Sequence, residues 1–351
     1  MPDISPAQWK YIVGMIDKGL CVPFLGAGVN VSSGQYVGLP LGGQLAIRIL
    51  RELLNLDDRQ IQTLTDITIQ PLGSQVAIGA LVNILKLSKG QEKKLTKIKI
   101  RGDVEASKYF KDIARISIYN LARIALHYEL EIDNRALKDL VVGLLPDKDR
   151  KPSKLLTTLA KLPFKLIVTT NYDRLMERAL DKAKRPYKVV VQPVSGFTPD
   201  EQTKLRDELA GYNGLIVYKL HGSFYDPPKG GKGSNKLVNA VPPRLIITEE
   251  DYIEFLTIVG IEDVGVPKLI AEKIVDSALL FLGYGLEDWD FRTLFKGLNE
   301  KIRNFEQRRS FAIQKSPSEF WVDFWERKKV NISDMDLYEF SEKLYEQYQR
   351  K

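Results

Sequence analysis

The stretch CVPFLGAGVN, residues 21–30, is the clearest indication of the fold class. Its first five residues are apolar and do not alternate with polar ones, which is typical of a strand buried on both faces. The turn that follows, Gly26-Ala27-Gly28, is of the kind that lets a backbone approach a phosphate and points amide N–H groups at it. An ordinary tight turn also explains these glycines, because Val31 stands where a third glycine would complete a dinucleotide-binding fingerprint. The stretch predicts the first strand of an α/β sheet and leaves its ligand open.

Five further apolar runs of the same kind follow along the chain, at residues 166–169, 189–191, 215–218, 279–282 and 310–313. Helical patterns lie between most of them, at residues 174–184, 249–256, 288–302 and 317–327. Strands and helices in alternation imply right-handed crossovers and an open parallel sheet. We therefore expect an α/β fold, a Rossmann-like parallel sheet with helices on both faces.

Residues 56–150 interrupt this alternation. Their apolar spacing predicts helices and shows no convincing buried strand, and the predicted helices span residues 61–69, 75–87, 106–130 and 134–145. The expected organisation is a sheet domain made of residues 1–55 and 151–351, with residues 56–150 as an inserted helical subdomain. Apolar helix faces in the insertion predict a homo-oligomeric or partner interface, with a self-contained helical lobe as the alternative.

The composition is that of a soluble globular protein, with 44% apolar and 28% charged residues among 351. The single cysteine, Cys21, excludes an internal disulfide and a four-cysteine zinc site. The sequence shows neither a run of about 18 apolar residues nor a signal peptide at its start. We therefore expect a cytoplasmic protein that does not associate with a membrane.

The net charge is small, since 52 basic and 45 acidic residues leave +7. Part of the excess lies in one run from Lys86 to Arg101, in which the only acidic residue is Glu92. A solvated helix or loop face explains such a run. A surface for a partner or a nucleic acid is the alternative.

Polar or glycine motifs follow three more of the predicted strands. They are Thr170-Asn171-Tyr172-Asp173, His221-Gly222 and Gly283-Tyr284-Gly285. In an open parallel sheet these strand ends share one edge, where ligands bind. Each motif has a simpler explanation, since Asn171 or Asp173 would cap the next helix and a lone histidine is more often structural. With the first glycine turn, the motifs predict a nucleotide site that contains one asparagine and one histidine. The other histidine, His127, lies in a helical pattern and is explained by packing.

In identity and order, these four motifs resemble those of the sirtuin-like family. The resemblance covers roughly residues 12–55 and 151–345 and leaves out the helical insertion. It is strongest to the divergent bacterial branch that lacks the zinc ribbon and hydrolyses NAD+ in antiphage defence, and the phrase GLEDWDFR at residues 285–292 favours that branch. Protein-deacylating sirtuins differ, because they have four zinc-binding cysteines and an acidic, aromatic and arginine motif where this chain has LGGQ at residues 41–44.

The resemblance implies roles for the matching positions. Asn171 would orient the ribose or the attacking water, and His221 would contact the ribose hydroxyls and act as general base, for which a pKa near 7 is suitable. These two residues are the candidate catalytic residues. The implied NAD-binding residues are Gly26, Ala27 and Gly28 at the pyrophosphate, Asp173 at the nicotinamide carboxamide, and Gly283 and Gly285 at the adenosine half. NAD is the expected substrate, and no metal is expected.

The resemblance therefore implies an NAD+ hydrolase that releases nicotinamide and ADP-ribose, as an effector that depletes NAD+ in bacterial antiphage defence. Two alternatives stay open: an NAD-dependent protein deacylase or ADP-ribosyltransferase, and a non-catalytic subunit that senses NAD or ADP-ribose. The implied partners are further copies of the chain in a homo-oligomer, a ring-shaped ATP-driven DNA translocase of the HerA type, or another defence-system protein.

Overall fold

A computed structural model of the chain describes residues 4–30, 39–61, 76–77, 85–97, 115–116, 120–147, 150–224, 245–259, 261, 264–286, 292, 295–296 and 308–351. The chain folds into two compact units. The sheet unit comprises residues 1–39, 147–246 and 253–351, and the helical unit comprises residues 40–146 and 247–252. None of the helices in these described ranges is long and apolar enough to cross a membrane.

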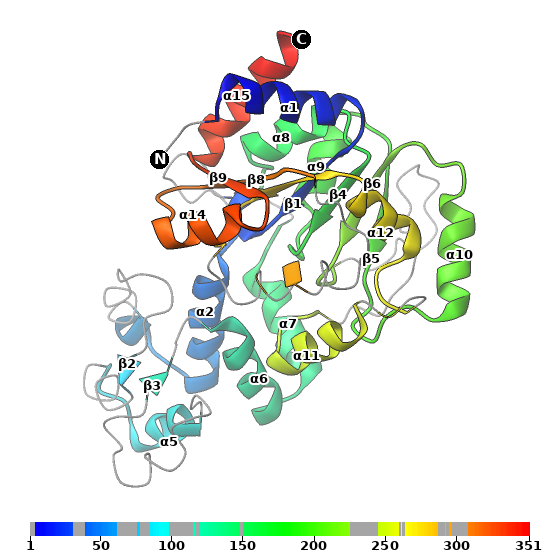
Figure 1. Ribbon diagram of the computed structural model, residues 1–351. Helices are drawn as coiled ribbons and strands as arrows, with labels where there is room; N and C mark the ends of the chain where they lie inside the picture. Colours follow the sequence, from blue (N-terminus) through cyan, green and yellow to red (C-terminus); the bar gives the residue numbers. More distant parts are fainter. Residues whose placement is uncertain are drawn as a thin grey trace. The chain divides into compact units, whose positions relative to one another are not determined.

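The sheet unit is built on seven parallel strands in the order β5-β6-β4-β1-β7-β8-β9 (Figure 1). Their bounds are β1 Cys21–Leu25, β4 Leu166–Thr169, β5 Tyr187–Val191, β6 Leu215–Lys219, β7 Ala278–Leu282, β8 Ser310–Gln314 and β9 Val330–Asp334. From β1 the chain continues to β4 on one side, and after β6 it returns to β7 on the other side of β1. The predicted α/β fold with a Rossmann-like parallel sheet is confirmed, and each predicted strand is present.

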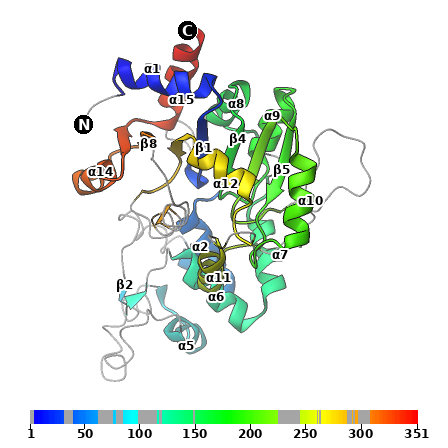
Figure 2. The same ribbon diagram turned by 45° about the vertical axis from the view of Figure 1, so that its right-hand side comes forward.

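Helices cover both faces of this sheet. On one face α1 (Pro6–Asp17) packs against α15 (Leu337–Gln349), α15 against α8 (Lys154–Lys161), and α8 against α9 (Leu175–Lys182). Figures 1 and 2 show α12 (Lys268–Val275) and α14 (Glu319–Glu326) on the other face. The remaining helices are α10 (Pro199–Leu209), which joins β5 to β6, and α11 (Glu249–Ile258).

The sequence sets these elements by simple local rules. The side chains of β1, β4 and β6 are buried along their whole length, as the unalternated apolar runs predicted. At the start of α10, Thr198 and Glu201 form a capping box, with Pro199 at the first helical position. Thr248 caps α11, because the Asp251 amide donates to Thr248 Oγ1 over 3.1 Å and the Thr248 amide donates to Asp251 Oδ2 over 3.0 Å. The helices predicted at residues 174–184 and 317–327 are present as α9 and α14.

One strand, β9, was not predicted. Its sequence VNISD alternates apolar and polar residues, as an edge strand does, and β9 pairs only with β8. The helix predicted at residues 288–302 lies largely outside the described residues.

The helical unit contains α2 (Gly42–Leu54), α5 (Lys89–Lys97), α6 (Leu121–Glu131) and α7 (Asn134–Leu144). α2 packs against α5, α6 and α7, so its contacts place it in this unit, whereas the sequence analysis assigned it to the sheet domain. α5 forms the middle of the basic run, and there Lys94 Nζ donates to the backbone oxygen of Leu53 over 3.0 Å. His127 lies half-buried on α6.

Two of the helices predicted in the insertion are wrong in part. Residues 76–77 (β2, Val76–Ala77) and 115–116 (β3, Arg115–Ile116) form a short antiparallel ladder, although helices were predicted over 75–87 and 106–130. The backbone partners of such a ladder lie far apart in the sequence, and apolar spacing carries no information about them. The helix predicted at 134–145 is present as α7, and the helix predicted at 61–69 lies almost wholly outside the described residues.

Candidate functional site

The motifs predicted to form the site lie at the carboxyl ends of four adjacent strands, β6, β4, β1 and β7. They fall in four segments that we call the β1 loop (residues 26–30), the β4 loop (170–174), the β6 loop (220–224) and the β7 loop (283–286). β1 is the strand from which the chain continues in opposite directions, which makes this edge the topological switch point of the sheet. Ligands bind at such points in open α/β sheets.

Glycines lock the β1 and β7 loops together. The amide of Gly26 donates to the backbone oxygen of Leu282, and the amide of Gly28 to that of Gly283, each over 2.9 Å. A Cβ on Gly28 would lie 2.8 Å from the Cα of Gly283, closer than side-chain atoms pack. Gly283 has a φ of +76°, and a Cβ there would lie 2.4 Å from the backbone nitrogen of Val29. The glycines therefore allow two backbones to touch, and their predicted role in binding a pyrophosphate stays a prediction.

Asn171 joins the β4 loop to the β1 loop. Its side-chain Nδ2 donates to the backbone oxygen of Gly26 over 3.1 Å, and its backbone amide donates to Thr169 Oγ1 over 3.1 Å. The backbone amide of Thr170 also donates to the oxygen of Leu25, over 3.1 Å. Since Nδ2 is directed at Gly26, the side-chain oxygen of the half-buried Asn171 is turned away from that carbonyl.

Asp173 is buried and uses both carboxyl oxygens. Oδ1 accepts the amide of Leu175, the first residue of α9, over 2.8 Å, so Asp173 bonds the helix start from the position before the N-cap residue Arg174. Oδ2 accepts a hydrogen bond from Nδ2 of Asn30 over 3.2 Å. Burial raises the pKa of Asp173, and the nearby charge of Lys219 opposes that rise.

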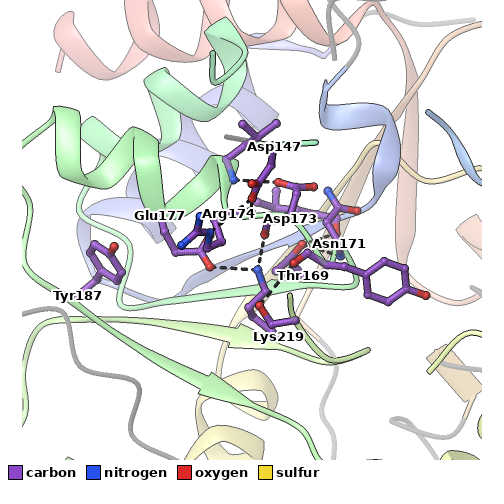
Figure 3. A network of polar contacts seen from close by, with 12 residues as sticks. Asp147, Thr169, Asn171, Asp173, Arg174, Glu177, Tyr187 and Lys219 are labelled. Carbon is purple, nitrogen blue, oxygen red and sulfur yellow. Dashed lines mark hydrogen bonds and ion pairs between the residues drawn. The ribbon is translucent and has the colours of Figure 1, made fainter. Parts of the chain in front are cut away.

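A fully buried lysine supports the β4 loop from below. Lys219, the last residue of β6, donates from Nζ to the backbone oxygen of Asp173 and lies 3.0 Å from Oε1 of Glu177 on α9 (Figure 3). Both side chains of this ion pair are buried, with exposed fractions of 0% and 7%. Separating or removing one partner of such a buried pair leaves the other charge without compensation. The pair therefore holds the groups around it in place.

His221 follows β6 and is held by contacts to Ile246 and Phe255. Its backbone oxygen accepts the amide of Ile246 over 3.0 Å, and its ring lies edge-on to the ring of Phe255. The next residue, Gly222, has a φ of +90°, which the sharp turn requires. Tyr172 links the segments, because its hydroxyl donates to the oxygen of Ile246 and its own oxygen accepts from Ser223 Oγ.

The imidazole of His221 is buried, and burial lowers its pKa from 6.5 to about 3. The sequence analysis expected a base with a pKa near 7. In the structure the ring is neutral at neutral pH and binds a proton weakly. The role of His221 as general base stays a prediction.

Residues 165–333 match the family described as SIR2-like domain. This segment, slightly less than half of the chain, is similar to a SIR2-like domain. The matched segment runs from β4 to β9 and includes Asn171, Asp173 and His221, while the β1 loop precedes it. The resemblance to the sirtuin-like family is thereby confirmed.

Two curated proteins are similar to this chain. The NAD(+) hydrolase ThsA of Bacillus cereus is 24% identical over 189 residues, which cover 51% of this chain and 33% of ThsA. Defense-associated sirtuin 2 of Bacillus subtilis is 24% identical over 174 residues, which cover 48% of this chain and 14% of that protein. The chain thus spans about a third or less of the length of these relatives.

The structure brings most of the predicted residues of the SIR2-like site together. Gly26, Gly28, Asn171 and Gly283 belong to one network of backbone and side-chain hydrogen bonds across three strand ends, and Ala27 and Gly285 lie within the same loops. Asp173 is joined to the β1 loop through Asn30. His221 lies on the next strand end and connects to this network through Tyr172.

Sequence reasoning missed three residues of this edge. Asn30 ends the stretch CVPFLGAGVN and received no role, and Lys219 directly follows the apolar run predicted at residues 215–218 and received none either. Tyr284 stands between two glycines, and its hydroxyl lies 3.2 Å from both Thr170 Oγ1 and the backbone oxygen of Leu25. The signal for Lys219 was present, because a lysine inside an apolar strand needs an acidic partner, and Glu177 is the fourth residue after Asp173.

The described residues contain no group of three or more His, Cys, Asp and Glu side chains that would hold a metal ion. Hydrolysis of NAD+ without a metal stays a prediction.

Proposed function

We propose that this chain hydrolyses NAD+ to nicotinamide and ADP-ribose and serves as an effector of bacterial antiphage defence that depletes NAD+. The observation that carries the proposal is the hydrogen bond from Asn171 at the end of β4 to Gly26 at the end of β1, beside the Asp173–Asn30 pair. It joins the motifs of a nucleotide site at the switch point of the sheet. The names of the two relatives, an NAD(+) hydrolase and a defence-associated sirtuin, support the same activity.

For NAD+ hydrolysis the protein has mainly to position the reactants and stabilise charge. Nicotinamide leaves C1′ of the ribose as a neutral molecule from a cationic ring, so its departure needs no proton. The transition state resembles an oxocarbenium ion, as in glycoside hydrolysis. Holding the water and the ribose in place is worth up to about 7–11 kcal/mol in such reactions. The side-chain oxygen of Asn171, turned away from Gly26, is an acceptor suited to holding that water or a ribose hydroxyl.

His221 suits this loose transition state even with a lowered pKa. Its neutral ring accepts a hydrogen bond from a ribose hydroxyl or from the attacking water. A water that adds to an oxocarbenium ion loses its proton late, so a weak base is sufficient. The expected contribution lies within the 10²–10⁴-fold range of general bases, toward the lower end.

The test is nicotinamide release by the purified chain. The wild-type protein should convert NAD+ to nicotinamide and ADP-ribose, resolved by liquid chromatography, while Asn171→Ala and His221→Ala should lower kcat/KM at least about 100-fold. Asn331→Ala on β9 and His127→Ala on α6 are matched controls that should keep the wild-type rate. Wild-type protein that binds NAD+ without releasing nicotinamide would contradict the proposal.

One observation favours a second candidate, a subunit that binds NAD+ or ADP-ribose without cleaving it. The burial of His221 and its pKa of about 3 suit a ring that only contacts the ligand. Calorimetric binding combined with the release assay separates the two functions, since a sensing subunit binds NAD+ and leaves it intact. In cells, phage infection should lower NAD+ only when the wild-type protein, and not Asn171→Ala, is present.

A further inference from the structure

Helix α14 carries a row of aromatic side chains that reaches the surface. Phe320 is 67% exposed, and Trp321 and Phe324 are half-buried beside it. The ring centroids of Phe320 and Trp321 lie 4.9 Å apart and those of Trp321 and Phe324 lie 5.3 Å apart, each pair edge to face. We call these three residues the α14 aromatic row. Contiguous apolar groups on a surface commonly mark an interaction site.

The α14 aromatic row is anchored in the core of the sheet unit. Phe324 contacts the buried Trp325, whose Nε1 donates to the backbone oxygen of Leu286 over 3.0 Å. Trp325 packs on Phe295, and Phe295 packs on Phe281 of β7, with ring centroids 4.9 Å and 5.8 Å apart. The exposed rings therefore belong to a continuous aromatic stack, and rings held in this way lose little conformational freedom when a ligand binds.

Two cations lie over the rings of the row. The guanidinium carbon of Arg292 lies 4.9 Å from the centre of the Trp321 ring and 5.7 Å from that of Phe324. Lys328 Nζ lies 5.2 Å from the centre of the Phe324 ring. Within the described ranges, no carboxylate forms an ion pair with Arg292 or Lys328. Both charges are thus placed against the rings and available to an anion.

The acidic residues of α14 lie on a different side of the helix. Glu319, Asp323 and Glu326 share one side, because they are spaced i, i+4 and i+7. The α14 aromatic row and Lys328 follow the same spacing one or two residues further along, so they occupy the neighbouring side. The helix therefore separates an acidic side from an aromatic and basic side.

Aromatic rings beside unpaired cations fit a single-stranded nucleic acid. Each nucleotide of a single strand presents a flat base, which stacks on an aromatic ring, and a phosphate, which pairs with a cation. The net charge of +7 attracts such a strand. A second copy of this chain fits less well, since it carries the same positive charge.

We propose that the α14 aromatic row, together with Arg292 and Lys328, binds single-stranded nucleic acid without sequence preference. A base stacks on the exposed ring of Phe320, and the two cations pair with neighbouring phosphates. The bases of a duplex are already stacked on one another, so the site selects single strands. The site lies on the face of the sheet that carries α12 and α14 (Figure 2), and its binding does not depend on NAD+ cleavage.

The experiment is fluorescence anisotropy with the purified chain and a labelled single strand of thymidines, longer than the ~4–16 nucleotides that such sites cover. Phe320→Ala should raise the Kd about tenfold because one stacked base is lost, while Phe320→Tyr keeps a ring and should keep the wild-type Kd. Two control variants should bind as the wild type. They are Leu130→Ala, which removes a side chain that is 72% exposed on α6, and Lys268→Ala, which removes an exposed cation on α12.

The salt dependence of binding tests the two cations. The logarithm of the affinity for a single strand falls with the logarithm of the salt concentration, with a slope of about −0.7 per phosphate contact. Two contacts predict that a fourfold rise in salt raises the Kd about sevenfold. Arg292→Ala removes one contact and should reduce this rise to about threefold.

Four outcomes overturn the proposal. The first is absence of binding at low salt. The second is a Kd that neither Phe320→Ala nor Arg292→Ala changes, because the strand is then held elsewhere on the chain. The third is equal affinity for a duplex of the same length, which excludes stacking. The fourth is competition by polyglutamate as strong as by unlabelled single strand, which assigns the surface to an acidic protein. Nicotinamide release, measured on the same protein, bears only on the proposed function.

Discussion

Acid should weaken the sheet unit through His221, and the structure gives the size of the effect. Folding lowers the pKa of this histidine from 6.5 to about 3, so between these values the unfolded chain binds a proton that the folded chain does not. Stability then falls as the pH drops through this window. Between pH 7.5 and pH 5.0 the loss attributable to His221 is about 2 kcal/mol, and it reaches about 5 kcal/mol below pH 3.

The measurement is urea unfolding followed by tryptophan fluorescence. All four tryptophans lie in the residue ranges of the sheet unit, so the signal reports on the unit that contains His221. The comparison is wild type against His221→Gln, whose side chain does not titrate. From pH 7.5 to 5.0 the wild type should lose about 2 kcal/mol more than His221→Gln, and His127→Gln should behave as the wild type. Equal losses of unfolding free energy in wild type and His221→Gln would contradict this prediction, because they would mean that burial does not lower the pKa of this imidazole.

Three further expectations follow from the same edge of the sheet. Lys219→Met should lower the free energy of unfolding by about 3–5 kcal/mol, because it leaves Glu177 buried without its partner. In urea unfolding, the double variant Lys219→Met/Glu177→Met should recover part of that loss. A double variant that is less stable than Lys219→Met would contradict this expectation. Gly28→Ala should lower the free energy of unfolding by about 1–3 kcal/mol and remove most of the NAD+ cleavage, because its Cβ would lie 2.8 Å from the Cα of Gly283. The control is Gly143→Ala in α7, where a Cβ meets nothing within 4 Å. This variant should stabilise the protein or leave its stability unchanged. Dialysis against a strong chelator should change neither the unfolding midpoint nor nicotinamide release, and a loss that only added zinc restores would show that the protein needs a metal.

The sheet was predictable because each of these strands has a recognisable local sequence pattern. The runs at 21–25, 166–169 and 279–282 are apolar on both faces, and only parallel strands covered by helices have such a pattern. β9 was not predicted because Asn331 and Ser333 interrupt its apolar residues, as an edge position allows. The β2–β3 ladder was not predicted because its pairing depends on a partner strand elsewhere in the chain.

The site was predictable where strand ends carry unusual residues, and not where its geometry depends on contacts across loops. Asn171 and His221 stand out in the sequence by type and place. Asn30 matters only through its contact with Asp173, 143 residues later, and no local pattern announces that contact. The lowered pKa of His221 likewise depends on burial by surrounding segments, which no local sequence pattern indicates.

The locking of β7 onto β1 has a consequence for biosynthesis. Tyr284 reaches the backbone oxygen of Leu25 across 259 residues of chain, and the glycines of both loops meet at the same place. At translation rates of about 5–20 residues per second, the ribosome makes β7 roughly 15–50 s after β1. Until then the middle strand of the sheet has one open edge, and the β1 loop lacks the backbone against which it is shaped. The nascent chain therefore completes this edge late, and a truncated product that stops before β7 has β1 and Asn171 but not the assembled strand-end site.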